Sequence, residues 1–234
     1  MKVLRASLFA LFFYPGTLVY VLAGMVASLF GTAPMRAVVL GWADFHAWLS
    51  RNVAGVTVRI EGELPPGQHL IAVKHQSMFE TIEILRIAPT PIIVLKRELA
   101  DMPLFGWMTR CWGMIRVDRE AGASAVRNML ASAKAARESG RPVAIFPEGT
   151  RVAEGQTPAL GAGFAGLYRA LGLPVVPIAM NSGRVWGASL PKAEGIVTFK
   201  VGETIPAGLK REEVEAKVHA AINALEISAP QPRA

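Results

Sequence analysis

The segment KHQSMFE at residues 74–80 contains a histidine and a carboxylate that could work together in proton transfer. A neutral imidazole such as that of His75 can take a proton from an alcohol near neutral pH. The carboxylate of Glu80, bound to the other ring nitrogen, would fix the tautomer and stabilise the imidazolium that forms. A pair of this kind needs an alcohol substrate and an activated acyl group.

The flanking residues predict a strand-to-helix junction that would position this pair. Leu70–Val73 is a short apolar run typical of a buried strand, and Ser77 followed by Glu80 forms a capping box that opens a helix through about Arg86. His75 then lies at the carboxyl end of the strand, where open α/β sheets bind ligands. The same residues also fit a purely structural interpretation, in which His75 is a hydrogen-bonded strand-end residue and Glu80 only caps the helix.

Two further blocks follow, GMIRVDR at residues 113–119 and FPEGTR at residues 146–151. Together with residues 74–80, and in this order, they resemble the blocks of the glycerolipid acyltransferase family, specifically of bacterial 1-acylglycerol-3-phosphate acyltransferases. The resemblance covers residues 70 to 182, and FPEGTR is its most specific part. The family's first block usually ends in Asp, where this chain has Glu80.

The resemblance implies a direct acyl transfer with His75 as the general base. His75 would remove the proton from the free glycerol hydroxyl of a lysophosphatidate, and Glu80 would orient and charge-balance the imidazole. The alkoxide would attack an acyl thioester carried by coenzyme A or acyl carrier protein as co-substrate, so neither an acyl-enzyme nor a cofactor is expected. Ser77 is a poor nucleophile for His75, because it lies two residues away at a helix N-cap.

Several residues are candidates for holding the substrates. Lys96 and Arg116 fall at or just after predicted strand ends, and cations gathered there would suit a phosphorylated alcohol, since guanidinium groups bind phosphate bidentately. The resemblance associates a further set with the phosphate-bearing acceptor: Arg119, Glu148, Gly149, Thr150 and Arg151. A carboxylate cannot contact phosphate directly, so Glu148 is expected to orient Arg151 or to accept a hydrogen bond from a glycerol hydroxyl. The resemblance also associates an apolar block with the acyl donor, although a buried strand would look the same: Val176, Pro177 and Ile178.

Composition indicates an anionic partner. The 234 residues suit one domain with a substantial core plus an appendage, and 52% of them are hydrophobic. The formal charge of +7 and the pI near 9.9 favour an anionic membrane surface or a phosphorylated substrate. The basic residues are scattered and accompany no nucleic-acid-binding motif, so nucleic acid is not an expected partner.

The remaining cysteine and histidines indicate no further chemistry. Cys111 is the single cysteine, so no intramolecular disulfide can form, and it is expected to be a small core residue. Three histidines lack a carboxylate at the matching spacing and are expected to be structural: His46, His69 and His219. No metal site is expected.

The N-terminus predicts the membrane attachment. Residues 6–35 contain no charged side chain, and Lys2 and Arg5 precede them. Positive charges at this position favour a cytoplasmic N-terminus. The expected location is the inner membrane, with the catalytic domain on the cytoplasmic side. A signal peptide is the alternative, although the apolar stretch is long for one.

The arrangement of this apolar stretch is left open by the sequence. Pro15-Gly16 interrupts it, so we expect either one tilted helix over residues 16–30 that spans the membrane or two shorter helices embedded in one leaflet. Residues 36–52 carry apolar side chains at helical spacing. They predict an amphipathic helix that either lies at the membrane interface or covers the domain core.

The rest of the chain predicts an α/β fold. Strands are expected at residues 56–60, 70–73, 91–96, 115–117, 142–146, 175–180 and 196–201. Helices are expected at residues 77–86, 103–112, 126–136, 163–171 and 214–225. This alternation predicts a largely parallel sheet flanked by helices. The resemblance implies that the fold is similar to that of glycerol-3-phosphate acyltransferases. The expected division is membrane-anchoring helices at 1–52, the acyltransferase α/β domain at 53–227 and a disordered tail at 228–234.

Two other functions fit the same motifs. The chain could acylate another lysolipid acceptor, such as a lyso-ornithine lipid or a lysophospholipid, an alternative that Glu80 leaves open. It could also be a non-catalytic module that binds anionic lipids. Loss of turnover on an acceptor without phosphate favours phosphatidate synthesis, whereas liposome binding without release of thiol from acyl-CoA favours the binding module.

Overall fold

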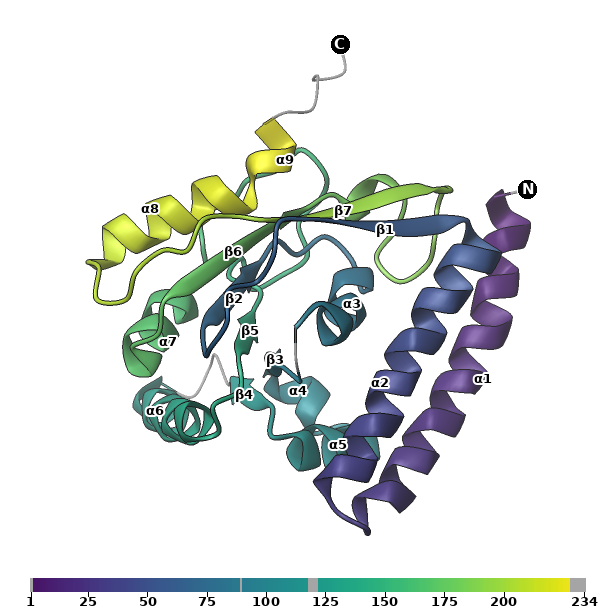
Figure 1. Ribbon diagram of the computed structural model, residues 1–234, viewed down its shortest axis with the longest axis horizontal. Helices are drawn as coiled ribbons and strands as arrows, with labels where there is room; N and C mark the ends of the chain where they lie inside the picture. The colour runs from purple at the N-terminus through teal and green to yellow at the C-terminus, as the bar shows by residue number, and fades with distance from the viewer. Residues whose placement is uncertain (1, 89, 118–121, 228–234) are drawn as a thin grey trace.

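A seven-stranded sheet lies at the centre of the computed structural model, which describes residues 2–88, 90–117 and 122–227, the side chains of 122–129 excepted (Figure 1). The strands are β1 Val56–Glu61, β2 Leu70–Val73, β3 Ile92–Lys96, β4 Ile115–Val117, β5 Val143–Ile145, β6 Val175–Met180 and β7 Gly195–Val201. They lie in the order β1-β7-β6-β2-β5-β3-β4. Of the neighbouring strands described here, β6 and β7 are antiparallel and the other pairs are parallel. The predicted α/β fold with a largely parallel sheet is therefore confirmed.

Strand β2 lies in the middle of this sheet because it is apolar on both faces. Ile71 pairs with Ala144 of β5 on one side and with Val176 of β6 on the other. A continuous apolar run is typical of a parallel strand that is covered on both faces. Since β5 and β6 both run parallel to β2, the segments that follow the three strands meet at one edge of the sheet.

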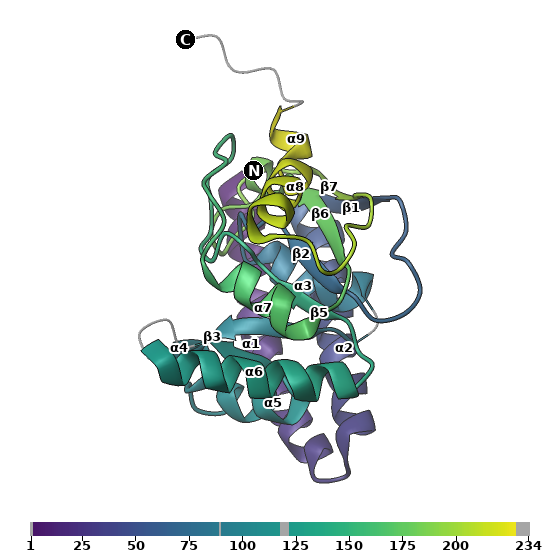
Figure 2. The ribbon, with the colours of Figure 1, turned by 90° about the vertical axis from the view of Figure 1, so that its left-hand side faces the viewer.

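Helical layers cover both faces of the sheet (Figures 1 and 2). The helices are α1 Lys2–Ser28, α2 Thr32–Leu49, α3 Phe79–Ile87, α4 Arg97–Ala100, α5 Phe105–Trp112, α6 Gly122–Glu138, α7 Gly163–Leu171, α8 Arg211–Ile222 and α9 Ala224–Ile227. Side chains of β2 alternate between the faces. Ile71 and Val73 share a core with α1, α2, α3 and α5, whereas Leu70 and Ala72 share one with α6, α7 and α8.

Helix α1 is continuous, although the sequence predicts an interruption at Pro15-Gly16. Proline cannot donate its intrahelical hydrogen bond and costs about 3 kcal/mol in a helix interior. Packing against α2 offsets this cost: Gly16 lies against the ring of Phe45, where an added Cβ would overlap it, and Trp42 Nε1 donates to Thr17 Oγ1 at 2.9 Å. The predicted break is therefore wrong, because tertiary contacts outweigh the local preference.

Helices α1 and α2 share one hydrophobic core with the sheet. Four residues of these helices are at most 1% exposed: Phe9 and Phe13 of α1, and Met35 and Leu49 of α2. They belong to the same hydrophobic cluster as Ile71 and Val73 of β2. Helix α2 therefore covers the core, while its other side exposes Trp48. The segment predicted as a separate anchor is thus built into the packing of the α/β fold.

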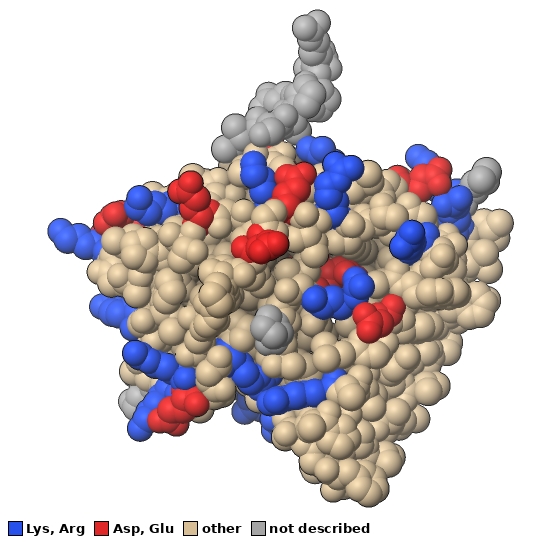
Figure 3. Space-filling view, in the orientation of Figure 1, with Lys and Arg blue, Asp and Glu red and all other residues tan. Residues whose placement is uncertain are grey.

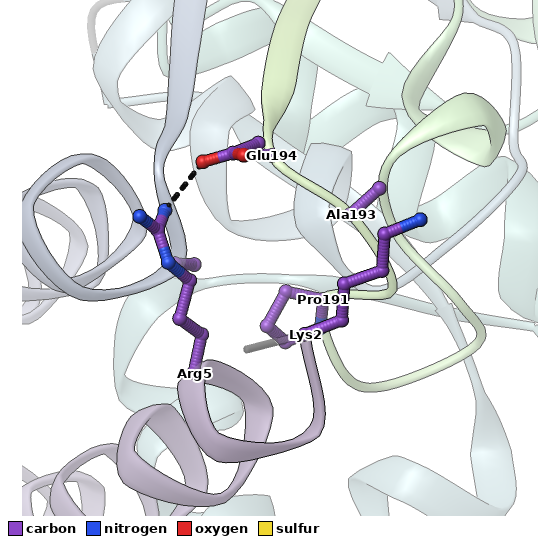
Figure 4. A pocket seen from close by; sticks show the side chains of 6 residues that line it. Lys2, Arg5, Pro191, Ala193 and Glu194 are labelled. Atoms are coloured by element: carbon purple, nitrogen blue, oxygen red, sulfur yellow. Dashed lines mark ion pairs between the residues drawn. The ribbon is translucent and has the colours of Figure 1, made fainter.

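An ion pair joins the start of α1 to the segment before β7 (Figure 4). Arg5 Nη1 lies 2.8 Å from Glu194 Oε2, beside a small pocket that is also lined by Lys2, Ala54, Pro191 and Ala193. Exposed ion pairs contribute about 0–1 kcal/mol. The contact therefore orients the beginning of α1 more than it stabilises the fold.

Some elements differ from the sequence-based expectations. Helices α4 and α9 are not predicted, because four residues are too few to show a helical period. The predicted apolar stripe of α6 is buried at Ala133 and Ala136 but exposed at Leu130. The expected tail at 228–234 lies outside the described residues.

Candidate active site

His75 and Glu80 form a close pair at the edge of the sheet where β2 ends. His75 Nδ1 lies 2.8 Å from Glu80 Oε1. The Glu80 side chain is fully buried, while 15% of the His75 side chain remains exposed. The imidazole stacks on the ring of Phe146, with ring centroids 4.3 Å apart. The structure thus brings together the two residues predicted as catalytic, and the FPEGTR block supports the histidine directly.

Glu80 also caps α3, so binding His75 and capping the helix are not alternatives. Its Oε1 accepts the backbone N–H groups of Gln76 and Ser77, both at 2.6 Å. Its Oε2 accepts the hydroxyls of Ser77 at 2.8 Å and of Ser182 at 2.9 Å. The buried Ser77 hydroxyl is therefore committed to this carboxylate, which agrees with its rejection as a nucleophile.

These contacts keep Glu80 ionised. Burial is the largest influence on this carboxyl and raises its pKa, but the hydrogen bond and charge of His75 and the hydrogen bonds of Ser77 together outweigh burial. The pKa of Glu80 is therefore lower than its ordinary value. Because an ionised carboxylate only accepts, Nδ1 carries the proton in a neutral His75, and Nε2 is the nitrogen that can accept one.

A fully buried ion pair holds the backbone next to His75. Lys74 Nζ donates to Glu148 Oε1 at 2.7 Å, to Gln156 O at 2.8 Å and to Asn223 Oδ1 at 2.7 Å. The other oxygen of Glu148, Oε2, accepts the backbone N–H of His75 at 2.9 Å. All protons of the ammonium group therefore have acceptors, and three distant parts of the chain meet at this one cation.

The role predicted for Glu148 needs correction. Its side chain has no exposed surface, and both oxygens are engaged, by Lys74 and by the backbone of His75. A carboxylate in this position holds the backbone of His75 and does not orient Arg151, whose side chain is exposed. A contact between Glu148 and a glycerol hydroxyl stays a prediction. Lys74 itself is missing from the predicted set. The signal that could have identified it is a lysine directly after a buried strand, since a buried cation needs a paired anion.

Gln76 links the histidine block to two further segments. Its Oε1 accepts the Gly183 N–H at 2.8 Å, and its Nε2 donates to Glu226 Oε1 at 2.5 Å. The second oxygen of Glu226 accepts the Gly155 N–H at 2.5 Å. The C-terminal helix α9 thus closes over the loop that follows FPEGTR.

The predicted phosphate-binding cations lie at the same edge of the sheet. Lys96 ends β3 and Arg116 lies in β4, and both side chains are exposed. Arg116 Nη1 lies 3.2 Å from Asp101 Oδ1. Figure 3 shows Lys and Arg side chains gathered over the region of α4, whereas the corner where α1 and α2 meet is uncharged.

The second half of FPEGTR turns outward after β5. Gly149 adopts a left-handed backbone conformation, with φ of 73°, which a residue with a Cβ rarely takes. Thr150 and Arg151 are exposed beyond this turn. Arg119, the remaining predicted cation, lies outside the described residues.

The predicted acyl-donor block lies inside the sheet. Val176, Pro177 and Ile178 belong to β6 and are buried, opposite Ile71, Ala72 and Val73 of β2. These residues are therefore part of the buried sheet next to the site and do not line its exposed surface. Their role toward the acyl donor stays a prediction.

His46 has a carboxylate partner that the spacing does not reveal. His46 Nδ1 lies 3.0 Å from Glu83 Oε1, both side chains are fully buried, and Glu83 Oε2 also contacts Arg86 Nη1 at 2.8 Å. The partner comes from α3, 37 residues along the chain, so the short spacing of the catalytic pair does not reveal it. The expectation that His46 is a structural residue is confirmed by its complete burial. Among the described residues, no group of three His, Cys, Asp or Glu could hold a metal ion.

Comparison with known proteins places residues 55–181 in the family model described as "Acyltransferase". A Pseudomonas aeruginosa protein named 1-acyl-sn-glycerol-3-phosphate acyltransferase is 35% identical over 178 residues, which is 75% of this chain and 69% of that protein. A Helicobacter pylori protein of the same name is 35% identical over 101 residues, 43% of this chain and 42% of that protein.

A solved structure has the same fold. The crystal structure of the 1-acyl-sn-glycerophosphate (LPA) acyltransferase PlsC from Thermotoga maritima superposes with a TM-score of 0.75. The match covers 100% of both chains at 22% sequence identity. The N-terminal helices are therefore part of the shared architecture.

Proposed function

This chain belongs to the acyltransferase family, and we propose that it transfers an acyl chain from an acyl thioester to the free hydroxyl of 1-acylglycerol-3-phosphate, giving phosphatidate. The observation that carries the proposal is the 2.8 Å contact between His75 Nδ1 and Glu80 Oε1 at the open edge of the sheet. The names of the relatives from P. aeruginosa and H. pylori supply the acceptor.

His75 acts as the base in this proposal. Glu80 holds the Nδ1 proton, so Nε2 takes the proton from the glycerol hydroxyl as its oxygen bonds to the thioester carbonyl carbon. The tetrahedral intermediate then collapses, the carbon–sulfur bond breaks, and the thiolate leaves with the proton that His75 returns. The ester and a free thiol are the products. The buried charge of Glu80 stabilises the imidazolium between these two steps.

The exposed cations bind the acceptor phosphate. These cations lie near the carboxyl ends of strands, at the same edge of the sheet as His75. Lys96 ends β3, Arg116 lies in β4, and Arg151 follows β5. Arginine suits this task because its guanidinium binds two phosphate oxygens at once. Arg119 of the second block is assigned to the same phosphate on the resemblance alone.

The lysophosphatidate acceptor is a lipid of the membrane surface, and α1 suits attachment to that surface. Helix α1 is long and apolar enough to cross a membrane by length and composition, and it exposes large apolar side chains. Because α1 also packs on the core, we infer that it lies along the protein with its outer face in lipid. An inner-membrane location, with the active site on the cytoplasmic side, agrees with Lys2 and Arg5 at its start.

The test is acyl transfer by the purified protein in mixed micelles. We expect thiol release from acyl-CoA or acyl carrier protein that depends on lysophosphatidate, with phosphatidate as the matched product. An acceptor panel with one donor distinguishes the alternatives. Equal turnover of lyso-ornithine lipid or a lysophospholipid would change the assigned acceptor, and binding to anionic vesicles without any thiol release would indicate a non-catalytic lipid-binding module.

A further inference from the structure

The corner after β6 contacts the catalytic pair from a part of the chain that no motif marks. Strand β6 ends at Met180, and a short 3-10 turn, Ser182–Arg184, follows. Because β6 runs parallel to β2, this corner lies at the same sheet edge as His75. Ser182 is fully buried there, and its hydroxyl lies 2.9 Å from Glu80 Oε2.

The hydroxyls of Ser77 and Ser182 form a triangle with Glu80 Oε2. They lie 2.8 Å and 2.9 Å from this oxygen and 2.9 Å from each other. Two hydroxyls have only two protons for these three contacts, so both protons can go to the carboxylate. The Ser77 oxygen accepts the Phe79 N–H at 3.1 Å, which satisfies it while its proton points to Glu80.

Among the described residues, Ser182 is the one donor to Glu80 from outside residues 74–80. The next residue, Gly183, donates its N–H to Gln76 Oε1 at 2.8 Å. Two successive residues of this corner therefore hold two residues of the histidine block. Ser182 adds to the hydrogen bond of Ser77 on Oε2, so turning the carboxylate away from His75 would break both of these bonds.

We propose that Ser182 is a positioning residue for acyl transfer, which acts through Glu80 to keep the carboxylate on His75 Nδ1. The inference rests on the proposed function and deepens it. Ser182 has no exposed surface, so it does not contact either substrate. Replacing Ser182 should therefore change kcat and its pH dependence, and it should leave the KM of the substrates unchanged.

Ser182→Ala in mixed micelles with lysophosphatidate and acyl-CoA tests this role. We expect kcat to fall about tenfold, the usual effect of losing a hydrogen bond to a charged group, with the KM of both substrates unchanged. A carboxylate with one donor fewer attracts the imidazolium more strongly, so the acid limb of the kcat/KM profile moves to higher pH. A merely structural role would leave that limb in place.

Two further variants complete the test. Ser50→Ala removes another buried hydroxyl, one without a hydrogen-bond partner in the described part of the chain, and should leave kcat and the pH profile unchanged. Ser182→Cys keeps a weak donor, so its kcat should lie between those of the wild type and of Ser182→Ala. If Ser182→Ala does not fold, Ser182→Cys provides the test. Wild-type kcat and pH profile in the folded Ser182 variant, or an equal shift in Ser50→Ala, would overturn the proposal.

A measurement without turnover separates this inference from the proposed function. The NMR signal of the His75 Nδ1 proton reports the hydrogen bond to Glu80 whether or not acyl transfer occurs. We expect this signal to shift in Ser182→Ala and to stay in place in Ser50→Ala. An inactive wild-type protein with this shift would reject the function and keep the positioning role, whereas an active wild-type protein without the shift would reject the positioning role alone.

Discussion

Glu80 Oε1 binds His75 Nδ1 at 2.8 Å with the same oxygen that accepts the backbone N–H of Ser77 at the start of α3. One atom therefore fixes both the imidazole and the first turn of the helix. This arrangement makes the direction of α3 and the orientation of His75 interdependent. It also places the negative charge at a helix N-terminus, where the helix dipole favours it.

Replacing His75 by alanine tests its role as the base. His75→Ala should lower kcat by about 10²–10⁴-fold or more, because no second base takes its place. Thiol release in mixed micelles measures this. His219→Ala, the same change on α8, serves as the control and should remain near wild type, since His219 Nε2 bonds to the carbonyl of Thr157 and to no other described residue. Near-normal turnover in His75→Ala would refute the mechanism.

Lys74→Met should destabilise the fold strongly. Removing one partner of a buried pair leaves Glu148 charged and uncompensated, a loss of about 3–5 kcal/mol in the free energy of unfolding. Denaturant unfolding in detergent measures it. Glu215→Gln removes the partner of Arg211 in an exposed pair and should cost only about 0.3–0.5 kcal/mol. Equal losses in the two variants would show that Lys74 and Glu148 do not form a buried pair in solution.

Stability should fall on acidification, in part because of Glu80. The pKa of Glu80 is lower in the folded protein than its ordinary value of 4.5, so the unfolded chain binds the proton more readily. The stabilisation is therefore present above pH 4.5 and is lost as the pH falls through the lower folded pKa. Denaturant midpoints compared between pH 7 and pH 3 should fall more steeply for the wild type than for Glu80→Gln. Identical slopes would mean that Glu80 is not ionised at neutral pH.

Charges on the outer face of α1 should release the protein from membranes. Leu18 and Leu22 are 54% and 49% exposed, so Leu18→Glu with Leu22→Glu introduces charge without emptying the core. Leu130→Glu, at an equally exposed position on α6, should leave vesicle binding unchanged. Deleting α1 is a less specific test, because Phe9 and Phe13 would leave the core with it. Unchanged co-sedimentation of the double variant with anionic vesicles would exclude this face as the attachment.

The parts of the site that the sequence predicts are those built from neighbouring residues. His75 and Glu80 meet across one strand-to-helix junction, so their spacing together with the two later blocks predicts the contact. Ser182 binds Glu80, and Asn223 binds Lys74, although each pair is more than a hundred residues apart in the sequence. A local sequence pattern cannot predict such contacts.

In the fold, too, local features are predicted and long-range contacts are not. The strands are predicted because apolar runs indicate buried segments, and their parallel order follows from the alternation with helices. The break at Pro15 is wrongly predicted because packing between α1 and α2 decides that helix, and such packing is not visible in either segment alone. The role of Glu148 is likewise set by Lys74, a residue from another strand end.

Glu80→Gln is the sharpest test of the pair, because the structure indicates that glutamine can keep the cap. Its amide oxygen can accept from the backbone N–H groups of Gln76 and Ser77, as Oε1 does. Its amide nitrogen then faces the hydroxyls of Ser77 and Ser182, which can rotate to accept instead of donate. The helix should therefore form, and the variant should remain folded and bound to membranes.

The same variant cannot stabilise the imidazolium, because its amide is neutral. Turnover should therefore fall by about 10²–10⁴-fold, with little change in KM. The matched control is Glu83→Gln, which neutralises another buried glutamate of α3 that is paired with a histidine, His46, away from the exposed edge. Glu83→Gln should lower the unfolding free energy and keep kcat. If Glu80→Gln retained full activity, or if both variants lost activity equally, Glu80 would be a helix cap alone and His75 would act without a charged partner.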